Sequence, residues 1–207
     1  MTPAEFQTAT GVWPERMADM AAFLERLIEA NAVMNLVGPD SIPDFWNRHA
    51  FDSAQLVDLA PEARTWADLG AGAGFPGVVL AILLKGRADA HVHLIDSLQK
   101  RCRFLQTIVD DLDLPATVVW GRAEEQAIKV DVVTARAVAP LDKLLGYAQP
   151  YMARGALGLF LKGEKAEVEL QEARKVWQVE GELSVSRSDP RGRILTVRKL
   201  RRGSQRA

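Results

Sequence analysis

The chain has 207 residues, of which 48% are hydrophobic and 26% charged, and its formal net charge is −1. This balance is typical of a soluble globular protein, and no apolar run reaches the roughly 20 residues that cross a membrane. The first residues lack the basic and apolar regions of a secretory signal. The single cysteine, Cys102, excludes an internal disulfide framework and indicates a reducing compartment. We therefore expect a cytoplasmic protein without a membrane partner.

Charge is distributed unevenly along the chain. Residues 1–60 carry nine acidic side chains against three arginines, whereas residues 187–206 carry eight basic side chains against one aspartate. A basic C-terminal end suits a polyanionic partner, although a solvated strand and tail would have the same composition. We expect the acidic N-terminal segment to contribute packing rather than phosphate contacts.

The first 60 residues have the apolar spacing of helices. Pro14 opens one stripe, which ends near Gly38 and Pro39, and a second stripe follows it. The first stripe consists of Met17, Met20, Ala21, Leu24, Leu27 and Ile28, and the second of Ile42, Phe45, Trp46, His49, Ser53, Leu56, Val57 and Ala60. We predict an N-terminal helical extension over residues 1–60.

After Pro61 short apolar runs alternate with amphipathic segments. The predicted strands cover residues 65–70, 90–96, 116–122, 130–137, 156–163, 181–187 and 192–200. Four helices are predicted between these strands. One begins at Pro76, one covers residues 98–112, one begins at Pro140, and a charged one runs to about residue 177. Such alternation predicts a mostly parallel sheet covered on both faces, and the last two strands, with no helix between them, predict an antiparallel hairpin at one edge. Residues 61–207 are thus expected to form an α/β domain with a doubly wound sheet of seven strands.

A glycine-rich loop follows the first predicted strand. Residues 72–77 satisfy G-x-G-x-x-G, which alone is a weak signature of a dinucleotide site. Gly70 and Gly72 would allow close approach of a ligand to the backbone. Asp68 ends the strand before the loop, and Asp96 ends the next strand, where a carboxylate can accept both hydroxyls of a ribose. Close packing of helix on strand is the alternative explanation of the glycines.

Two enzyme classes use this strand, loop, helix and acid arrangement: nicotinamide-dependent oxidoreductases and class I methyltransferases, which bind S-adenosylmethionine. The helical extension and the closing hairpin favour the Rossmann-like methyltransferase plan. A nucleotide-binding interaction protein without catalysis is a third hypothesis.

Six segments between residues 31 and 175 together resemble the RsmG family, also called GidB. In order, they are NLVGPDSIPDFWNRHAFDSAQL, DLGAGAGFPGVVLAI, LIDSLQKRCRFLQ, GRAEE, VTARAVAPLDKLL and LFLKGEKAEVEL. The resemblance implies methylation of N7 of a guanine in 16S ribosomal RNA by S-adenosylmethionine. The partner would be that RNA or a small-subunit particle, and we expect the protein to be a monomer.

The resemblance also implies site residues. Gly70 and Phe75 would line the pocket of the methyl donor, and Ala123 and Glu124 would meet its adenine. Arg136 ends the fourth predicted strand, where ligands bind in doubly wound sheets, and would contact the cofactor or an RNA phosphate. An ion pair with a carboxylate such as Glu124 is the alternative for Arg136.

Other side chains are candidates for contacts to RNA. The basic residues that could flank an RNA path are Lys100, Arg101, Arg103 and Lys162. A solvated helix start would also explain the first three. His49 lies on an apolar stripe, so it is either a core histidine or a direct contact to the guanine.

The expected chemistry requires little acid–base catalysis. Guanine N7 has a lone pair and no proton, so alignment and desolvation would be the work of the enzyme. The fourth predicted strand is followed neither by the [DNS]-P-P-[FYW] pattern of amino-group methylation nor by a nucleophilic cysteine. We expect Cys102 to be a small buried residue. No metal-ligand spacing is present, and no catalytic residue is assigned.

Overall fold

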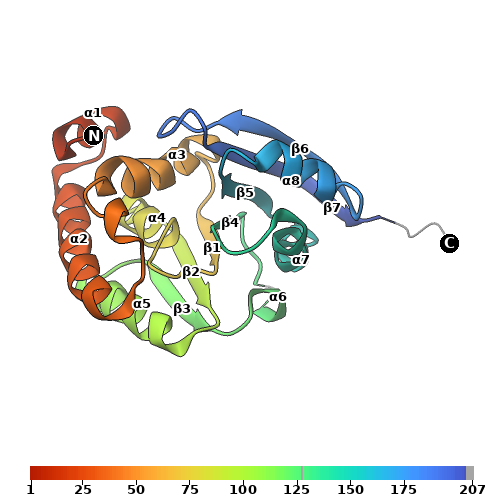
Figure 1. The fold of residues 1–207 in the computed structure, drawn as a ribbon. Coiled ribbons are helices and arrows are strands. Elements are labelled where there is room, and N and C mark those ends of the chain that lie inside the picture. The colour runs from red at the N-terminus through yellow and green to blue at the C-terminus, as the bar shows by residue number, and fades with distance from the viewer. Residues whose placement is uncertain (127, 204–207) are drawn as a thin grey trace.

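The computed structural model describes residues 1–126 and 128–203. Seven strands form one sheet in the order β3-β2-β1-β4-β5-β7-β6 (Figure 1). The strands are β1 (Thr65–Leu69), β2 (His91–Asp96), β3 (Ala116–Trp120), β4 (Val132–Arg136), β5 (Leu157–Lys162), β6 (Trp177–Val185) and β7 (Arg193–Arg202). Strands β1 to β5 pair with one another in parallel, whereas β7 is antiparallel to both β5 and β6. The predicted doubly wound sheet with an antiparallel hairpin at its edge is confirmed.

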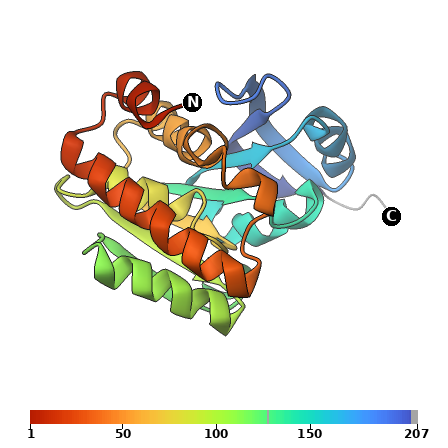
Figure 2. The same cartoon turned by 60° about the vertical axis from the view of Figure 1, so that its left-hand side comes forward.

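Helices cover both faces of the sheet. They are α1 (Pro3–Thr10), α2 (Pro14–Met34), η1 (Pro39–Ser41), η2 (Phe45–Phe51), α3 (Asp52–Leu59), α4 (Gly77–Leu84), α5 (Gln99–Asp111), α6 (Ala123–Gln126), α7 (Leu141–Met152) and α8 (Ala166–Ala173). Figure 2 shows α2 and α5 side by side, and an ion pair of 2.9 Å joins Arg26 to Asp111 between them. Helix α4 packs on the same face, while α7 and α8 pack on the other. Among the helices of the described residues, none is both long and apolar enough to cross a membrane.

The core consists of two hydrophobic clusters separated by the sheet. Alternate residues of a strand point to opposite faces, so Trp66 of β1 joins one cluster while Ala67 and Leu69 join the other. Phe6 and Phe23 of the N-terminal helices are fully buried in the first cluster. Residues 1–60 therefore share a hydrophobic core with the sheet.

The buried face of α2 differs from the predicted stripe. Ile28 is 48% exposed, whereas Phe23, outside that stripe, is fully buried. The Phe23 ring packs against Phe45 and Phe75, with centroids 6.0 and 5.4 Å away. Burial of a large aromatic ring stabilises more than burial of one aliphatic side chain, so the helix turns its phenylalanine inward.

Two further local features were not predicted from the sequence, the capping box of α1 and the π-helical form of η2. Helix α1 begins with a capping box, in which Thr2 accepts from the Glu5 amide and the Glu5 side chain accepts from the Thr2 amide. The Thr-x-x-Glu spacing is a sequence signal for this start. The segment that contains His49 is a π-helix, η2, rather than an α-helix, and π-helical turns often occur at functional sites.

Gly77 closes the junction between β1 and α4. A Cβ at this position would collide with the Leu94 side chain and lie 2.6 Å from Oδ2 of Asp68. Gly77→Ala should therefore lower the free energy of unfolding by about 1–3 kcal/mol, the usual effect of overpacking a core. Urea unfolding measures this loss. In the control Gly163→Ala the new Cβ meets nothing within 4 Å, and equal losses in both variants would contradict the packing role.

Candidate active site

A cavity of about 1020 Å³ opens at the carboxyl ends of β1, β4 and β5. The strand order reverses between β1 and β4, which is where doubly wound sheets bind their ligands. Its walls come from the loop at 36–41, from η2 and the start of α3, from the glycine loop at 70–75, and from residues 136–137, 161–164 and 188–192. Segments from both ends of the chain thus meet at the sheet's switch point.

The glycines of the loop have different tasks. Gly72 has φ +55°, and a Cβ there would meet only the carbonyl oxygen of Gly70, at 3.5 Å. At Gly77, by contrast, packing alone excludes a side chain. Close packing therefore explains Gly77, while Gly72 presents open space in the cavity wall to a ligand.

Asp96 holds the glycine loop in place by hydrogen bonds to backbone amides. Its Oδ2 accepts from the Gly72 amide at 2.9 Å and its Oδ1 from the Leu98 amide at 2.8 Å. Each carboxylate oxygen has a second lone pair, so Asp96 can hold the loop and still accept hydroxyl groups of a ribose. The carboxylate and the open glycine beside it fit the nucleoside part of S-adenosylmethionine.

Asp68 has a structural task that the sequence motif did not reveal. The side chain is fully buried, and its Oδ2 accepts from the Gly77 amide at 2.8 Å. Its Oδ1 has no hydrogen-bond partner among the described residues. Burial raises the pKa of Asp68 to about 7, against the opposing effects of the Gly77 amide and the Arg136 charge.

The guanidinium of Arg136 is held on several sides. It lies over the Phe75 ring, 4.9 Å from the centroid, in a cation–π contact. Its nitrogens donate to the carbonyl oxygen of Arg48 at 2.9 Å and to Nδ1 of His49 at 2.6 Å. Oδ2 of Asp52 is 3.7 Å away and supplies the opposite charge. The guanidinium is therefore fixed at the carboxyl end of β4.

His49 is neutral in this arrangement. The residue is 4% exposed, and its ring stacks on Phe75, with centroids 4.4 Å apart and an angle of 15° between the planes. Because Arg136 can only donate, Nδ1 of His49 accepts, and the proton of the neutral ring is on Nε2. Burial, followed by the charges of Arg136 and Arg48, lowers the pKa of His49 to about 3. His49 is thus a buried residue beside the cavity that carries no charge near neutral pH.

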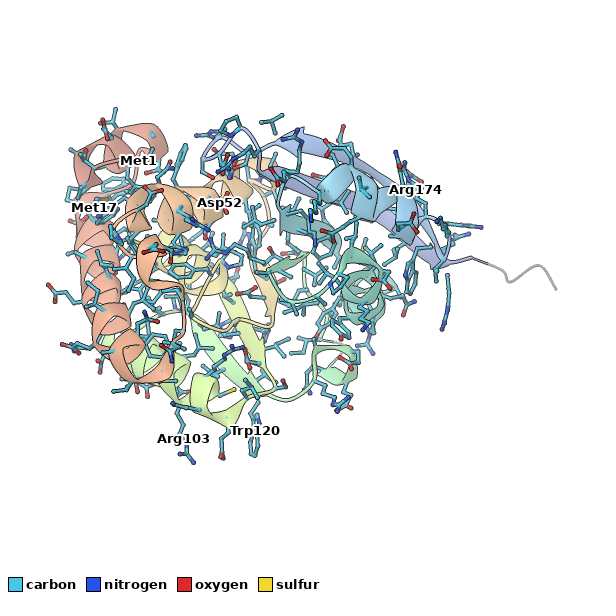
Figure 3. The ribbon with its side chains drawn as sticks, viewed as in Figure 1. Met1, Met17, Asp52, Arg103, Trp120 and Arg174 are labelled. Atoms are coloured by element: carbon cyan, nitrogen blue, oxygen red, sulfur yellow. The ribbon has the colours of Figure 1, made fainter. Side chains whose placement is uncertain are left out.

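Asp52 links this cluster to the C-terminal hairpin. Its Oδ1 accepts from Ser188 Oγ at 2.6 Å, from Ser186 Oγ at 3.0 Å and from Gln55 Nε2 at 3.0 Å. Gln55 also accepts from the Arg187 amide at 2.9 Å. Figure 3 shows Asp52 at the start of α3, which lies beside the turn between β6 and β7. This network holds one wall of the cavity in place.

The predicted site residues divide into two groups. Those that line the cavity are Gly70, Gly72, Phe75, His49, Arg101, Arg136 and Lys162. Those outside its lining are Asp96, Ala123, Glu124, Lys100 and Arg103. Ala123 begins α6, where its carbonyl oxygen accepts from the Tyr151 hydroxyl at 2.7 Å. The contacts of both groups with a ligand stay predictions.

Two of these basic residues form ion pairs with carboxylates. Arg136 pairs with Asp52 rather than with Glu124, and Lys162 forms a 2.7 Å ion pair with Glu169. Cys102 is a buried free thiol, as expected. Among residues 1–126 and 128–203, no cluster of three or more His, Cys, Asp or Glu side chains could hold a metal ion.

Much of the basic C-terminal end is paired with acids. Arg198 lies 2.6 Å from Glu182 and Lys199 lies 3.0 Å from Glu180, across the β6–β7 pair. Arg206 lies outside the described residues. Pairing lowers the charge that this end offers to a polyanion, in favour of the solvated-strand interpretation.

Strand order, glycine loop and cavity together define a class I methyltransferase fold. The fold is similar to that of an O-methyltransferase from Bacillus cereus, with a TM-score of 0.59 at 17% identity over 86% of this chain and 91% of the other. The chain belongs to the GidB family, rRNA small subunit methyltransferase G, which matches residues 16–191. A ribosomal RNA small subunit methyltransferase G from Caulobacter vibrioides (strain NA1000 / CB15N) is 60% identical over 199 residues, covering 96% of this chain and 92% of the relative. One from Paramagnetospirillum magneticum is 44% identical over 205 residues, covering 98% of each.

The open position at Gly72 can be tested directly. Gly72→Val places a branched side chain where the ligand approaches, so S-adenosylmethionine binding should fall below detection in calorimetry while the protein remains folded. Gly11→Val is the control, because Gly11 also has positive φ, +63°, and a Cβ there meets nothing within 4 Å. It carries the same backbone strain without facing the cavity. Full cofactor affinity in Gly72→Val would contradict a ligand at this loop.

Asp68 should make stability depend on pH. Its pKa of about 7 in the folded protein exceeds the ordinary value of 3.8, so its contribution to stability is fully present below about pH 4 and is lost as the pH rises through 7. Asp68→Asn keeps an acceptor for Gly77 and stays neutral. Relative to the unaltered protein, it should gain stability between pH 4 and 8, on the order of a few kcal/mol.

Urea unfolding at several pH values measures this gain. Asp110→Asn, at an exposed position of α5, is the control and should show no such trend. A difference between Asp68→Asn and the unaltered protein that is constant from pH 4 to 8 would refute a buried, titrating Asp68.

Proposed function

We propose that the protein methylates N7 of a guanine in 16S ribosomal RNA with S-adenosylmethionine as the methyl donor. The observation that carries this proposal is the family match over residues 16–191, which includes every residue of the cavity lining except Gly192. When bound, S-adenosylmethionine supplies an electrophilic methyl group on a sulfonium sulfur.

The side chains around the cavity have the properties that this reaction needs. Gly72 and Asp96 would hold the nucleoside of the cofactor, as their geometry allows. Phe75 and Arg136 form a rigid wall beside them, because the guanidinium is fixed against the ring. Positioning of this kind lowers the barrier by presenting the reacting groups in the correct orientation.

The protonation states suit a nucleophile that has no proton to lose. His49 is neutral, with the accepting nitrogen already bonded to Arg136. Asp52 faces Arg136 with one carboxylate oxygen and accepts from three donors with the other. Neither group is free to act as a general base, and guanine N7 requires none. We infer that this wall orients the guanine and excludes water.

We propose that the protein works as a monomer in the cytoplasm, on free 16S RNA or on a small-subunit particle. A nicotinamide-dependent oxidoreductase is the competing function for a glycine-rich loop of this kind. Separate titrations with NADH and S-adenosylmethionine distinguish the two, and only the second should bind.

Mapping of N7-methylguanosine tests the function. 16S RNA from cells with and without the gene should differ at one guanine, and the purified protein should restore the modification in vitro. Gly72→Val is the negative control for the purified protein. Identical RNA from both kinds of cell would refute the proposal, as would cofactor binding without methyl transfer to RNA or particle.

Neutralisation of basic side chains should separate the two candidate RNA surfaces. Replacing Lys100, Arg101 and Arg103 by glutamine should weaken RNA binding, and each lost phosphate contact should lower the slope of log affinity against log salt by roughly 0.7. Replacing Arg198 and Lys199, which are paired with glutamates, should change the slope less. RNA binding is measured between 50 and 200 mM salt, and cofactor affinity is measured separately. Equal effects of both sets would contradict a dominant role for α5.

A further inference from the structure

Trp120 exposes its indole at the edge of the sheet where the cavity opens. It is the last residue of β3, at the carboxyl end of that strand, and it is 62% exposed. Its Nε1 donates to the carbonyl oxygen of Ser97 at 3.1 Å. The polar atom of the ring is thus satisfied within the protein, which fixes the indole and leaves its apolar surface in contact with water. Leu98, directly after Ser97, is 52% exposed and adds a second apolar side chain beside this anchor.

A short series of contacts joins Trp120 to the cavity. Trp120 is paired with Asp96 in the parallel register of β2 and β3, so their backbones lie about 5 Å apart. Oδ2 of Asp96 accepts from the Gly72 amide and lies 3.7 Å from the guanidinium of Arg101. Gly72 and Arg101 both line the cavity. The indole therefore begins one strand spacing from the carboxylate that supports the cavity wall.

Two cations beside the indole are open to a ligand. Arg103 on α5 and Arg122, two residues beyond Trp120, are exposed and form no ion pair within the part of the chain that the structure describes. Helix α5 packs against β3, and Figure 3 shows the side chains of Arg103 and Trp120 at the same edge of the molecule. One of the two acids of α6, Glu124, lies toward α7, because burial, followed by its charge, raises the pKa of the Tyr151 hydroxyl. The exposed aromatic surface thus adjoins two guanidinium groups without acidic partners.

We propose that Trp120 is a stacking platform for a nucleotide of the single-stranded RNA that flanks the target guanine, with Arg103 and Arg122 beside its phosphates. This inference rests on the proposed function, which makes RNA the substrate in the cavity. Aromatic side chains beside basic ones are the usual platform for single-stranded nucleic acids, since every base has a π-face. Unpaired bases of RNA loops are recognised in this way. A strand that leaves the cavity past Arg101 crosses the start of α5 and reaches the indole next.

Substitution of Trp120 tests the proposal. Trp120→Ala should weaken the binding of 16S RNA transcribed in vitro roughly tenfold, the usual effect of losing one stacked base. Trp120→Phe should restore most of the affinity, because phenylalanine also stacks. Trp120→Leu, which is apolar but has no π-face, should not restore it. The affinity for S-adenosylmethionine should be the same in all three variants.

The chain offers a matched control for the loss of an exposed indole. Trp13 is 75% exposed, but it lies in the turn between α1 and α2 and does not line the cavity. Trp13→Ala should therefore bind the RNA as tightly as the unaltered protein does. Equal losses in Trp13→Ala and Trp120→Ala would contradict a specific platform at the end of β3.

The charged part of the proposal has its own test. Arg122→Gln should lower the slope of log RNA affinity against log salt by roughly 0.7, the effect of one lost phosphate contact on a single strand. Lys129→Gln removes another exposed cation, in the segment before β4, and should leave the slope unchanged. An unchanged slope in Arg122→Gln would overturn the assignment of a phosphate to this side chain.

The outcomes distinguish this inference from the proposed function. If the unaltered protein methylates the RNA but Trp120→Ala binds it equally well, the platform is refuted and the proposed function stands. A parallel loss of S-adenosylmethionine affinity would assign the indole to the cofactor, and a loss confined to small-subunit particles would assign it to a protein; either result overturns the inference. If the unaltered protein methylates neither RNA nor particle, the proposed function fails and the inference fails with it. Urea unfolding of each variant excludes misfolding as the cause.

Discussion

The contact between the Arg136 guanidinium and the Phe75 ring is the interaction on which the cavity depends. Arg136 ends β4, and Phe75 belongs to the glycine loop after β1, so the contact joins two strands at the point where the sheet's order reverses. His49 is stacked on the same ring and accepts from the same guanidinium. Asp52 balances the charge and extends the network to Ser188, 136 residues further along the chain. Removal of the guanidinium would take away the contacts of Phe75, His49 and Asp52 with Arg136 at the same time.

The network also explains the form of the N-terminal segment. The π-helix η2 is followed directly by α3, and this junction turns both His49 and Asp52 toward Arg136. The aromatic rings of Phe23 and Phe45 support Phe75 from behind. The N-terminal helices thus stabilise the site as well as the fold, and their acidic composition does not prevent basic residues from other elements, such as Arg187, from gathering beside them.

The strands, the sheet type and the glycine loop could be predicted because their signals are local. Alternation of apolar runs and helices, and glycines between strand and helix, are visible within 30 residues. The partners of Asp52 could not be predicted, since Ser186 and Ser188 follow it by more than 130 residues. The same holds for the choice between Ile28 and Phe23 as the buried residue of α2, which depends on rings supplied by later elements. Arg136 was found from its place at a strand end, but its ionic partner is set by tertiary contacts.

Long-range ¹H–¹⁵N NMR of the His49 imidazole tests the central claim most directly, namely that the site orients its substrate without acid–base catalysis. The geometry predicts a neutral ring between pH 5 and 8, with the proton on Nε2 and none on Nδ1, because Arg136 donates to Nδ1. Arg136→Gln should allow the ring to take up a proton more readily, which assigns the effect to the guanidinium. A His49 that titrates near pH 6.5 in the unaltered protein, or that carries its proton on Nδ1, would contradict the account.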